Sequence, residues 1–178
     1  GGSLIFNASD SDNVIDFAKF QHLPNSFFNN IFGRRYGIVF EGSGQWTLQN
    51  DLTTDHQILF NSGHLNTAGF NLSTENFISN SSNTRSLNLG NSLVFISETL
   101  EIGAEDPITL IPASSSIYFS GTRFEGGSQN YHTITVDNFL FTTVNNVSST
   151  PSNSTISDNN FFDSLMLKQG TVLKLEGN

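Results

Sequence analysis

Short apolar strings separated by polar turns run through the whole chain. The string IVF at 38–40 is followed by Glu-Gly, and ILF at 58–60 is followed by Asn-Ser-Gly, so the two have the same length and similar flanks. Short runs of β-branched, leucine and aromatic residues bounded by Gly, Asn and Ser are typical of β-strands, and they are too short for amphipathic helices. The pattern therefore predicts an all-β protein.

Related strings recur at intervals of roughly 17 to 26 residues, close to the shorter repeat periods of solenoid proteins. Residues 46–90 are the clearest sample, because each apolar string there is broken by Asn, Ser, Thr or Gly before a helical turn is complete. The recurrence predicts a stack of two- or three-stranded coils. Further strings of the series are FI at 77–78, LVF at 93–95, IYF at 117–119, FLF at 139–141 and LML at 165–167.

Secondary strands between these strings alternate apolar and polar residues. Leu87 and Leu89 fall on one side of such a strand, and Ser86 and Asn88 fall on the other. Glycines between strands are expected to supply the positive φ of tight corners, for which Asn is the next best residue. We expect several asparagines to bind turn backbone groups and to stack from coil to coil. They are Asn61, Asn66, Asn71, Asn83, Asn88 and Asn91.

These patterns predict a parallel β-helix or β-solenoid of about seven or eight coils, which would be a rod roughly 35 to 40 Å long. An antiparallel β-sandwich is the alternative, because it also has many short strands. Two-residue Asn-Gly hairpin turns are missing from the sequence, which favours the solenoid.

Residues 1–178 are expected to form a single solenoid block of a longer chain, because residue 1 is glycine. Residues 1–36 are expected to be an irregular or capping portion, in which residues 4–6 and 14–17 are typical of short strands and residues 17–32 fit a loop or one short helix. The very polar stretch at 148–160 is interpreted as a projecting loop.

Composition limits the classes of partner. The chain carries 7 Lys and Arg against 16 Asp and Glu, a formal net charge of -9, which disfavours nucleic acid and anionic membranes. It has no cysteine, so disulfides and thiolate metal sites are excluded. No segment approaches the about 20 apolar residues that cross a bilayer, so we expect no membrane insertion. The 17 phenylalanines argue against disorder.

Four phrases resemble a known class of protein: WTLQNDLT at 46–53, LFNSGHLNTAGFNLSTENF at 59–77, SNTRSLNLGNS at 82–92 and YFSGTRFEGGSQNYHTITV at 118–136. They resemble repeat regions of very large surface proteins of Bacteroidetes, including SprB-like gliding adhesins, which are exported by the type IX secretion system. The resemblance covers about residues 37–141 and transfers no catalytic residue. It implies a solenoidal, secreted, structural or adhesive part displayed on the bacterial cell surface.

A catalytic β-helix is the alternative class. Glycoside hydrolysis requires two carboxylates at a defined separation, and the sequence has neither an Asp-Asp pair nor a Gly-His-Gly motif. We interpret His56 and His64 as surface turn residues, and Trp46 and Tyr118 as partly core residues. The sequence thus predicts a non-catalytic structural or adhesive segment, with a carbohydrate-binding or polysaccharide-degrading β-helix as the alternative.

Two candidate sites concern carbohydrate. Arg34, Arg35 and Tyr36 are expected to form an exposed group that contacts a surface polysaccharide or another extracellular ligand. Ser164 lies in Asp-Ser-Leu, which matches the short O-glycosylation pattern of Bacteroidetes. Neighbouring domains of a larger protein are the other expected partners.

The densest acidic group consists of Glu98, Glu101, Glu105 and Asp106. Carboxylates on turns are the ligands that calcium prefers, so this group is a weak candidate for a calcium site. Solvated acidic residues on a loop are the simpler interpretation, and no cofactor other than calcium is expected.

Overall fold

The computed structural model describes residues 3–17, 37–102 and 108–121 with their side chains. For later strands it describes the backbone alone, at 123–125, 130–136, 154–157, 161–167 and 173–175. The described strands form two sheets, with the orders β1-β3-β6-β8-β10-β12-β14-β16 and β11-β9-β7-β4-β2. Short strands such as β13, β15, β17 and β5 extend the first sheet beyond this path.

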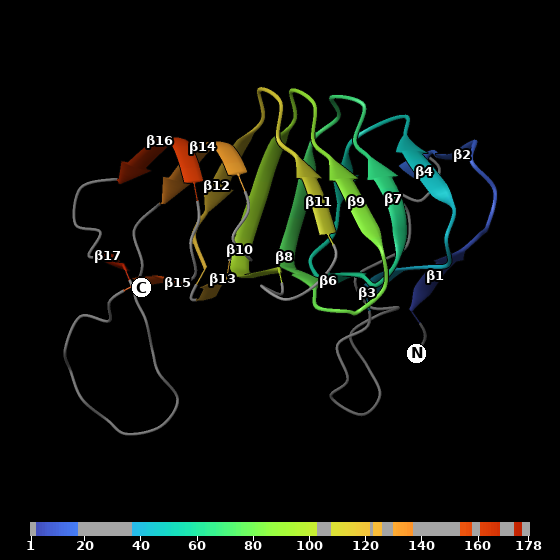
Figure 1. Ribbon diagram of the computed structural model, residues 1–178, viewed down its shortest axis with the longest axis horizontal. Coiled ribbons are helices and arrows are strands. Elements are labelled where there is room, and N and C mark those ends of the chain that lie inside the picture. The colour runs from blue at the N-terminus through green and yellow to red at the C-terminus, as the bar shows by residue number, and fades with distance from the viewer. Residues whose placement is uncertain are drawn as a thin grey trace, which may run out of the picture.

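Successive strands lie on three faces of each coil, and on each face they pair with the coils before and after (Figure 1). The first face holds β1 (Leu4–Asn7), β3 (Gly37–Glu41), β6 (Gln57–Phe60), β13 (Arg123–Glu125), β15 (Ser154–Ser157) and β17 (Leu173–Leu175). The second face holds β2 (Asn13–Ile15), β4 (Gln45–Leu48), β7 (Gly63–Asn66), β9 (Arg85–Asn88) and β11 (Ile108–Ile111). The third face holds β5 (Leu52–Thr53), β12 (Ser116–Phe119), β14 (Asn130–Val136) and β16 (Phe161–Leu167).

Two long strands join the third face to the first. β8 (Leu72–Ser79) pairs with β5 through Leu72 and with β6 through Phe77, so its two halves lie on different faces. β10 (Leu93–Ile102) follows β8 around the same corner, with a shift of register between Ile96 and Thr99. The chain therefore turns this corner without leaving strand geometry.

Each strand pair among the described residues is parallel. Residues 37–102 make about three turns of a parallel β-solenoid. The predicted all-β solenoid is confirmed, and the β-sandwich alternative is wrong, because a sandwich of this kind is built from antiparallel strands.

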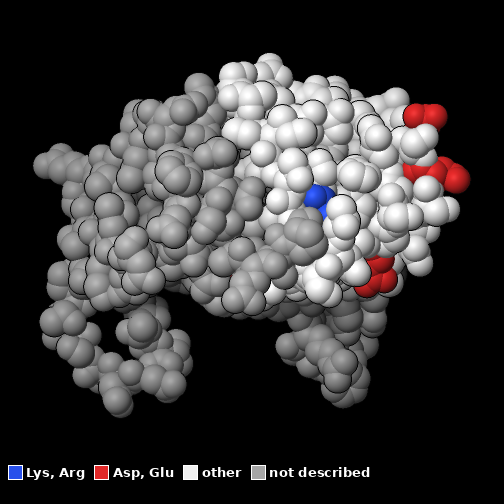
Figure 2. Space-filling model, viewed as in Figure 1, with Lys and Arg blue, Asp and Glu red and all other residues white. Residues whose placement is uncertain are grey.

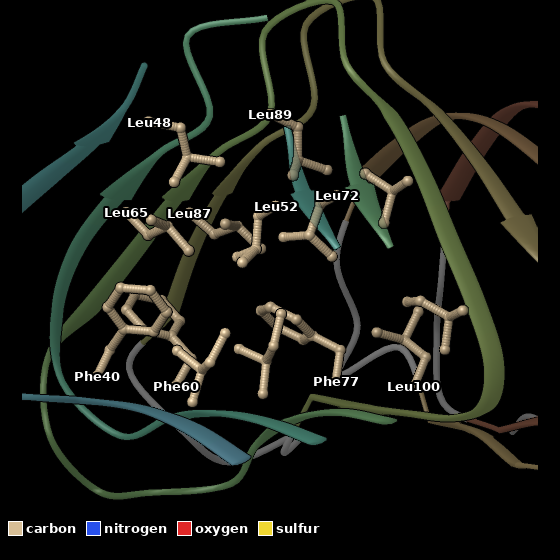
Figure 3. Close-up of a cluster of buried hydrophobic side chains, with 14 of the residues drawn as sticks. Phe40, Leu48, Leu52, Phe60, Leu65, Leu72, Phe77, Leu87, Leu89 and Leu100 are labelled. Atoms are coloured by element: carbon tan, nitrogen blue, oxygen red, sulfur yellow. The ribbon is translucent and has the colours of Figure 1, made fainter. Parts of the chain in front are cut away.

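The core lies inside the coils, where inward side chains at the same position of successive coils stack in columns. Trp46 pairs with Leu65, and Leu65 pairs with Leu87, on the second face. Figure 3 shows the leucines and phenylalanines of this interior pointing toward one another from the three faces. Burial of each such side chain contributes roughly 1.5 to 3 kcal/mol, so the columns supply much of the stability.

Aromatic rings form one of these columns. Phe6 stacks on Phe40 at 5.1 Å between ring centroids, and Phe40 meets Phe60 edge-on at 6.1 Å. Trp46, which is 1% exposed, contacts Phe40 from the second face at 5.5 Å. The coils of β1, β3 and β6 thus each contribute a phenylalanine ring to the same column.

The series of apolar strings read from the sequence belongs to two faces. Ile38, Ile58 and Phe77 are paired on the first face, as one repeat predicts. The next strings, LVF at 93–95 and IYF at 117–119, are paired with each other on the third face. The interpretation of a single series was wrong here, because β10 turns a corner and places apolar residues on both faces. The first face continues instead through Leu100 and Phe124, while FLF at 139–141 lies outside the described residues.

The corner between the second and third faces is built alike in successive coils. Ala68, Gly90 and Ala113 occupy the same position and have φ values of 53°, 55° and 44°. In each coil the following turn is closed by a backbone hydrogen bond of about 3 Å: Phe70 N to Thr67 O, Ser92 N to Leu89 O, and Ser115 N to Pro112 O. The expected positive φ is confirmed at Gly42, Gly63, Gly69 and Gly90, whereas alanine, which was not expected there, adopts it at two of the three repeated corners.

Asparagine side chains bind turn backbone groups, as predicted. Asn66 Oδ1 accepts from Ala68 N at 3.0 Å, and Asn88 Oδ1 accepts from Gly90 N at 3.1 Å. Asn66 and Asn88 are paired on adjacent strands, so the same turn contact repeats one coil later. Asn71 Oδ1 accepts from the backbone of the next coil, at Leu93 N and 3.1 Å.

The strands expected near the start of the chain are present as β1 and β2, and a strand also lies in the polar stretch that was interpreted as a projecting loop. Within residues 1–36, β1 pairs with β3 and β2 pairs with β4. Residues 18–36, which include most of the candidate loop or helix, lie outside the described residues. In the polar stretch 148–160, β15 pairs with β13 and β17. None of the described residues forms a helix long and apolar enough to cross a membrane.

Candidate functional site

An open groove of about 390 Å³ lies on the outer side of the third face. The small side chains of Thr54, directly after β5, and of Ser73, in β8, line part of it. Phe95 and Tyr118 line it from the next two coils, and Asp55 and Glu75 line it beside the corner. On the outside of the third face, the small Ser73 of β8 is thus followed by the large Phe95 and Tyr118 of the next two coils, and this change in side-chain size forms the groove.

Phe95 and Tyr118 form a stacked aromatic pair on the outside of the solenoid. They are paired residues of β10 and β12, and their ring centroids lie 5.2 Å apart with an interplanar angle of 15°. Phe95 is 41% exposed and Tyr118 is 36% exposed. Alternation of side chains along the strands explains the exposure, because Val94 and Ile96 on either side of Phe95 point inward and are buried.

The second face of the Phe95 ring is turned toward the groove. Because the two rings are stacked and belong to adjacent coils, the line joining them runs along the solenoid and across the planes of both rings. Tyr118 therefore covers one face of Phe95, and the opposite face points back toward the coil of β8. The residue paired with Phe95 on that side is Ser73, whose side chain is too small to cover a phenyl ring.

Two carboxylates lie next to this ring. Glu75 stands two residues after Ser73 in β8, and Asp55 lies in the bend that follows β5 in the preceding coil; both line the groove with Phe95. Asp55 is exposed and Glu75 is half-buried. The hydroxyls of Ser97 and Ser120 continue this polar edge past the aromatic pair. The groove therefore joins an apolar ring face to a row of hydrogen-bonding groups.

A β-bulge shapes the corner beside the carboxylates. Between its pairs with Thr74 and Asn76, β10 carries two residues where β8 carries only Glu75. The additional residue turns Glu98 outward, and the bulge presses against the next coil at Gly121. A Cβ on Gly121 would overlap the carbonyl group of Glu98, so only glycine fits there. Bulges commonly redirect side chains next to binding sites.

Charge near the groove is negative. Arg85 is the one Lys or Arg whose side chain is described, and it is 0% exposed on the second face. The acidic side chains are mostly at the surface. On the face that Figure 2 draws, which carries β7, β9 and β11, acidic groups lie toward one end and one basic side chain is seen among uncharged residues. The described surface therefore offers carboxylates and amides, and no exposed Lys or Arg.

The described residues that line the groove include none of the site residues predicted from the sequence. Arg34, Arg35 and Tyr36 are outside the described residues. Ser164 lies in β16, where its backbone pairs with Thr133, and its side chain is outside the described part.

The predicted acidic group is described in part. Glu98 is exposed on the bulge, whereas Glu101 is 9% exposed and accepts a hydrogen bond from Asn80 Nδ2 at 2.8 Å. Glu105 and Asp106 are outside the described residues. Within the described ranges, no group of three or more His, Asp or Glu side chains is arranged to hold a metal ion.

The predictions for individual aromatic and histidine residues were confirmed for some residues and wrong for others. Trp46 is buried, so its assignment to the core is confirmed. Tyr118 is an outward residue of the groove, so its assignment to the core was wrong. His64 is exposed as predicted, although it lies in β7 and not in a turn. Phe95 was missed, because the string LVFI reads as uniformly apolar and hides its alternation.

Comparison with protein-family models, with curated proteins and with solved structures found no match for this chain. No relative therefore suggests a substrate or a partner. The groove and the solenoid are the features from which a function can be inferred.

Proposed function

We propose that this chain is a non-catalytic adhesive segment of a secreted bacterial surface protein, and that its groove binds polysaccharide. The observation that carries the proposal is the open face of Phe95, which adjoins two carboxylates and a row of hydroxyls. Binding sites commonly combine an apolar surface with a few polar groups that fix orientation. A sugar ring matches both, since one face presents C–H groups and its edge presents hydroxyls.

Stacking gives the aromatic pair a definite role in this proposal. A pyranose bound over Ser73 would place its C–H face against Phe95, and its hydroxyls would reach Asp55 and Glu75. Tyr118 supports the ring of Phe95 from behind, at 5.2 Å, and so limits its rotation. A ring that is already held in place loses little conformational entropy when it binds, which favours affinity.

The solenoid suits attachment because repetition makes it long and stiff. We propose that the stack continues to about seven or eight coils, a rod of roughly 35 to 40 Å. The parallel pairs of β14 with β16 and of β15 with β17 support this extension. The resemblance of four phrases to type IX-secreted surface proteins of Bacteroidetes, such as gliding adhesins, supports export and a place at the cell surface.

A polysaccharide-degrading enzyme is a second candidate, because of the positions of Asp55 and Glu75. They belong to adjacent coils and line the same groove, Asp55 in the bend after β5 and Glu75 in β8. Glycosidases commonly act through two carboxyl groups that flank the bond to be cleaved. Product formation is the observation that distinguishes the two candidates.

The test uses the full chain on an array of neutral, acidic and amino-group-bearing polysaccharides. We expect binding to at least one class, and we expect Phe95→Ala to abolish it. Ile111→Ala is the matched control, because Ile111 is 43% exposed on the second face, away from the groove. Silence of the native chain across the array, or equal binding by both variants, would refute the proposal. Release of reducing ends by the native chain, and its loss in Glu75→Gln, would favour the enzyme.

A further inference from the structure

We infer that the groove selects polysaccharides that carry protonated amino groups over those that carry carboxylates. This inference rests on the proposed function and names the class of ligand for the same site. Its basis is the combination, in one groove, of an open aromatic face with two acidic side chains and no described basic side chain.

The position of the two carboxylates determines which part of a ligand they meet. Asp55 and Glu75 line the groove together with Phe95. A sugar that covers the ring of Phe95 with one face would therefore meet these carboxylates with its edge. Substituents of a sugar ring project from that edge, and they include the amino group of an amino sugar. An ammonium group there would have a carboxylate partner from each of two adjacent coils, and charge-assisted hydrogen bonds of this kind are the stronger ones.

The aromatic pair adds to the same preference. A cation near the face of an aromatic ring is attracted by the electrons of that face, and the attraction is larger when the cation is partly removed from water. Phe95 offers such a face within the groove that also contains Glu75. Both kinds of contact therefore favour an ammonium group over a neutral amide at this place.

Acidic sugars are expected to be repelled by the same carboxylates. A uronate stacked on Phe95 would bring its carboxylate toward Asp55 and Glu75, which disfavours binding through repulsion between like charges. The buried side chain of Arg85 lies on the second face and does not line the groove. The net charge of -9 adds a longer-range repulsion at low ionic strength.

Oligosaccharides that differ only in charge test the inference. The probes are a glucosamine oligomer, an N-acetylglucosamine oligomer of equal length and linkage, and a galacturonate oligomer. Binding to the full chain is measured by calorimetry at low and high salt, at a pH that keeps the glucosamine amines protonated. We expect the glucosamine oligomer to bind at least about fivefold more tightly than the acetylated one at low salt, and less so at high salt.

Substitutions then assign the preference to the groove. Asp55→Asn and Glu75→Gln are each expected to weaken glucosamine binding about two- to fivefold and to leave binding of the acetylated oligomer unchanged. Asp12→Asn is the control, because Asp12 is an exposed carboxylate in the loop before β2 and away from the groove. An equal effect of all three substitutions would mean that only net charge matters, and it would overturn the inference.

The remaining outcomes separate the inference from the proposed function. Equal affinity for the amino and acetylated oligomers, or a preference for galacturonate, overturns the inference, while loss of that binding in Phe95→Ala leaves the proposed function intact. Failure to bind any of the three oligomers also overturns the inference, and the polysaccharide array then decides the proposed function by itself.

Discussion

Gly63 and Gly90 provide a direct test of how closely the coils are packed, because both have positive φ but only one has room for a side chain. Their φ values are 85° and 55°. A Cβ on Gly90 would have its nearest neighbour at 3.6 Å, an ordinary contact with Gly69 N. A Cβ on Gly63 would lie 2.5 Å from Trp46 Cζ3 and 2.6 Å from the carbonyl oxygen of Gly44.

The magnitudes follow from these distances. Gly90→Ala should destabilise the fold by about 1 kcal/mol, since the left-handed conformation costs an L-residue about 1 to 2 kcal/mol and reduced freedom of the unfolded chain offsets part of it. Gly63→Ala carries the same term and an overlap of about 1 Å with two neighbours, whose cost is roughly 1 to 3 kcal/mol or more. We therefore expect Gly63→Ala to cost about 2 to 4 kcal/mol. Trp46 does not relieve the overlap, because it is 1% exposed.

Urea unfolding followed by far-ultraviolet circular dichroism measures both variants without relying on the fluorescence of Trp46, which Gly63→Ala perturbs directly. The free energies of unfolding should differ by at least about 1 kcal/mol between the two variants, which is the cost of the overlap. Equal losses of stability would refute the reasoning, because they would mean that the coil at Gly63 opens freely. Adding Trp46→Leu should recover only part of the loss, since the overlap with the Gly44 carbonyl oxygen remains.

Three further predictions concern other parts of the fold. Ala113→Gly should raise the free energy of unfolding by about 0.5 to 1 kcal/mol, because Ala113 has a φ of 44°, and a lower urea midpoint would contradict this. Leu65→Ala should cost about 2 to 5 kcal/mol by the same measurement, whereas the neighbouring and exposed His64→Ala should cost less than about 0.5 kcal/mol. Gly121→Ala should displace the bulge at Glu98, and so lower both the melting temperature and the affinity of the groove for its oligosaccharide; unchanged affinity would show that the bulge does not shape the site.

The strands could be predicted because their signal is local. Apolar strings, alternation and the turn residues Gly and Asn act within a few neighbours, so Leu87 and Leu89 were correctly placed on one side of a strand. The assignment of strings to faces could not be predicted, because it depends on where a strand bends. β10 runs through a corner, and neither its apolar residues nor their spacing marks the bend.

The groove was harder to predict from the sequence than the strands or their faces. Its central residue, Phe95, stands among Leu93, Val94 and Ile96, and the four residues look alike in the sequence although only Val94 and Ile96 are buried. An outward assignment of Tyr118 would have placed Phe95 outward as well, because the two residues are paired on adjacent strands. That pairing joins residues of different coils and leaves no local trace.

The repeated corner at Ala68, Gly90 and Ala113 gives the chain a simple way to grow. Because φ and the closing hydrogen bond are alike at successive corners, a duplication of residues 69–90 would begin and end at equivalent points. The inserted segment would add one coil and lengthen the rod by about 4.8 Å, and the coils on either side would meet surfaces like those that they already contact. Its length is thus adjustable in whole steps by in-frame duplication or loss of one segment.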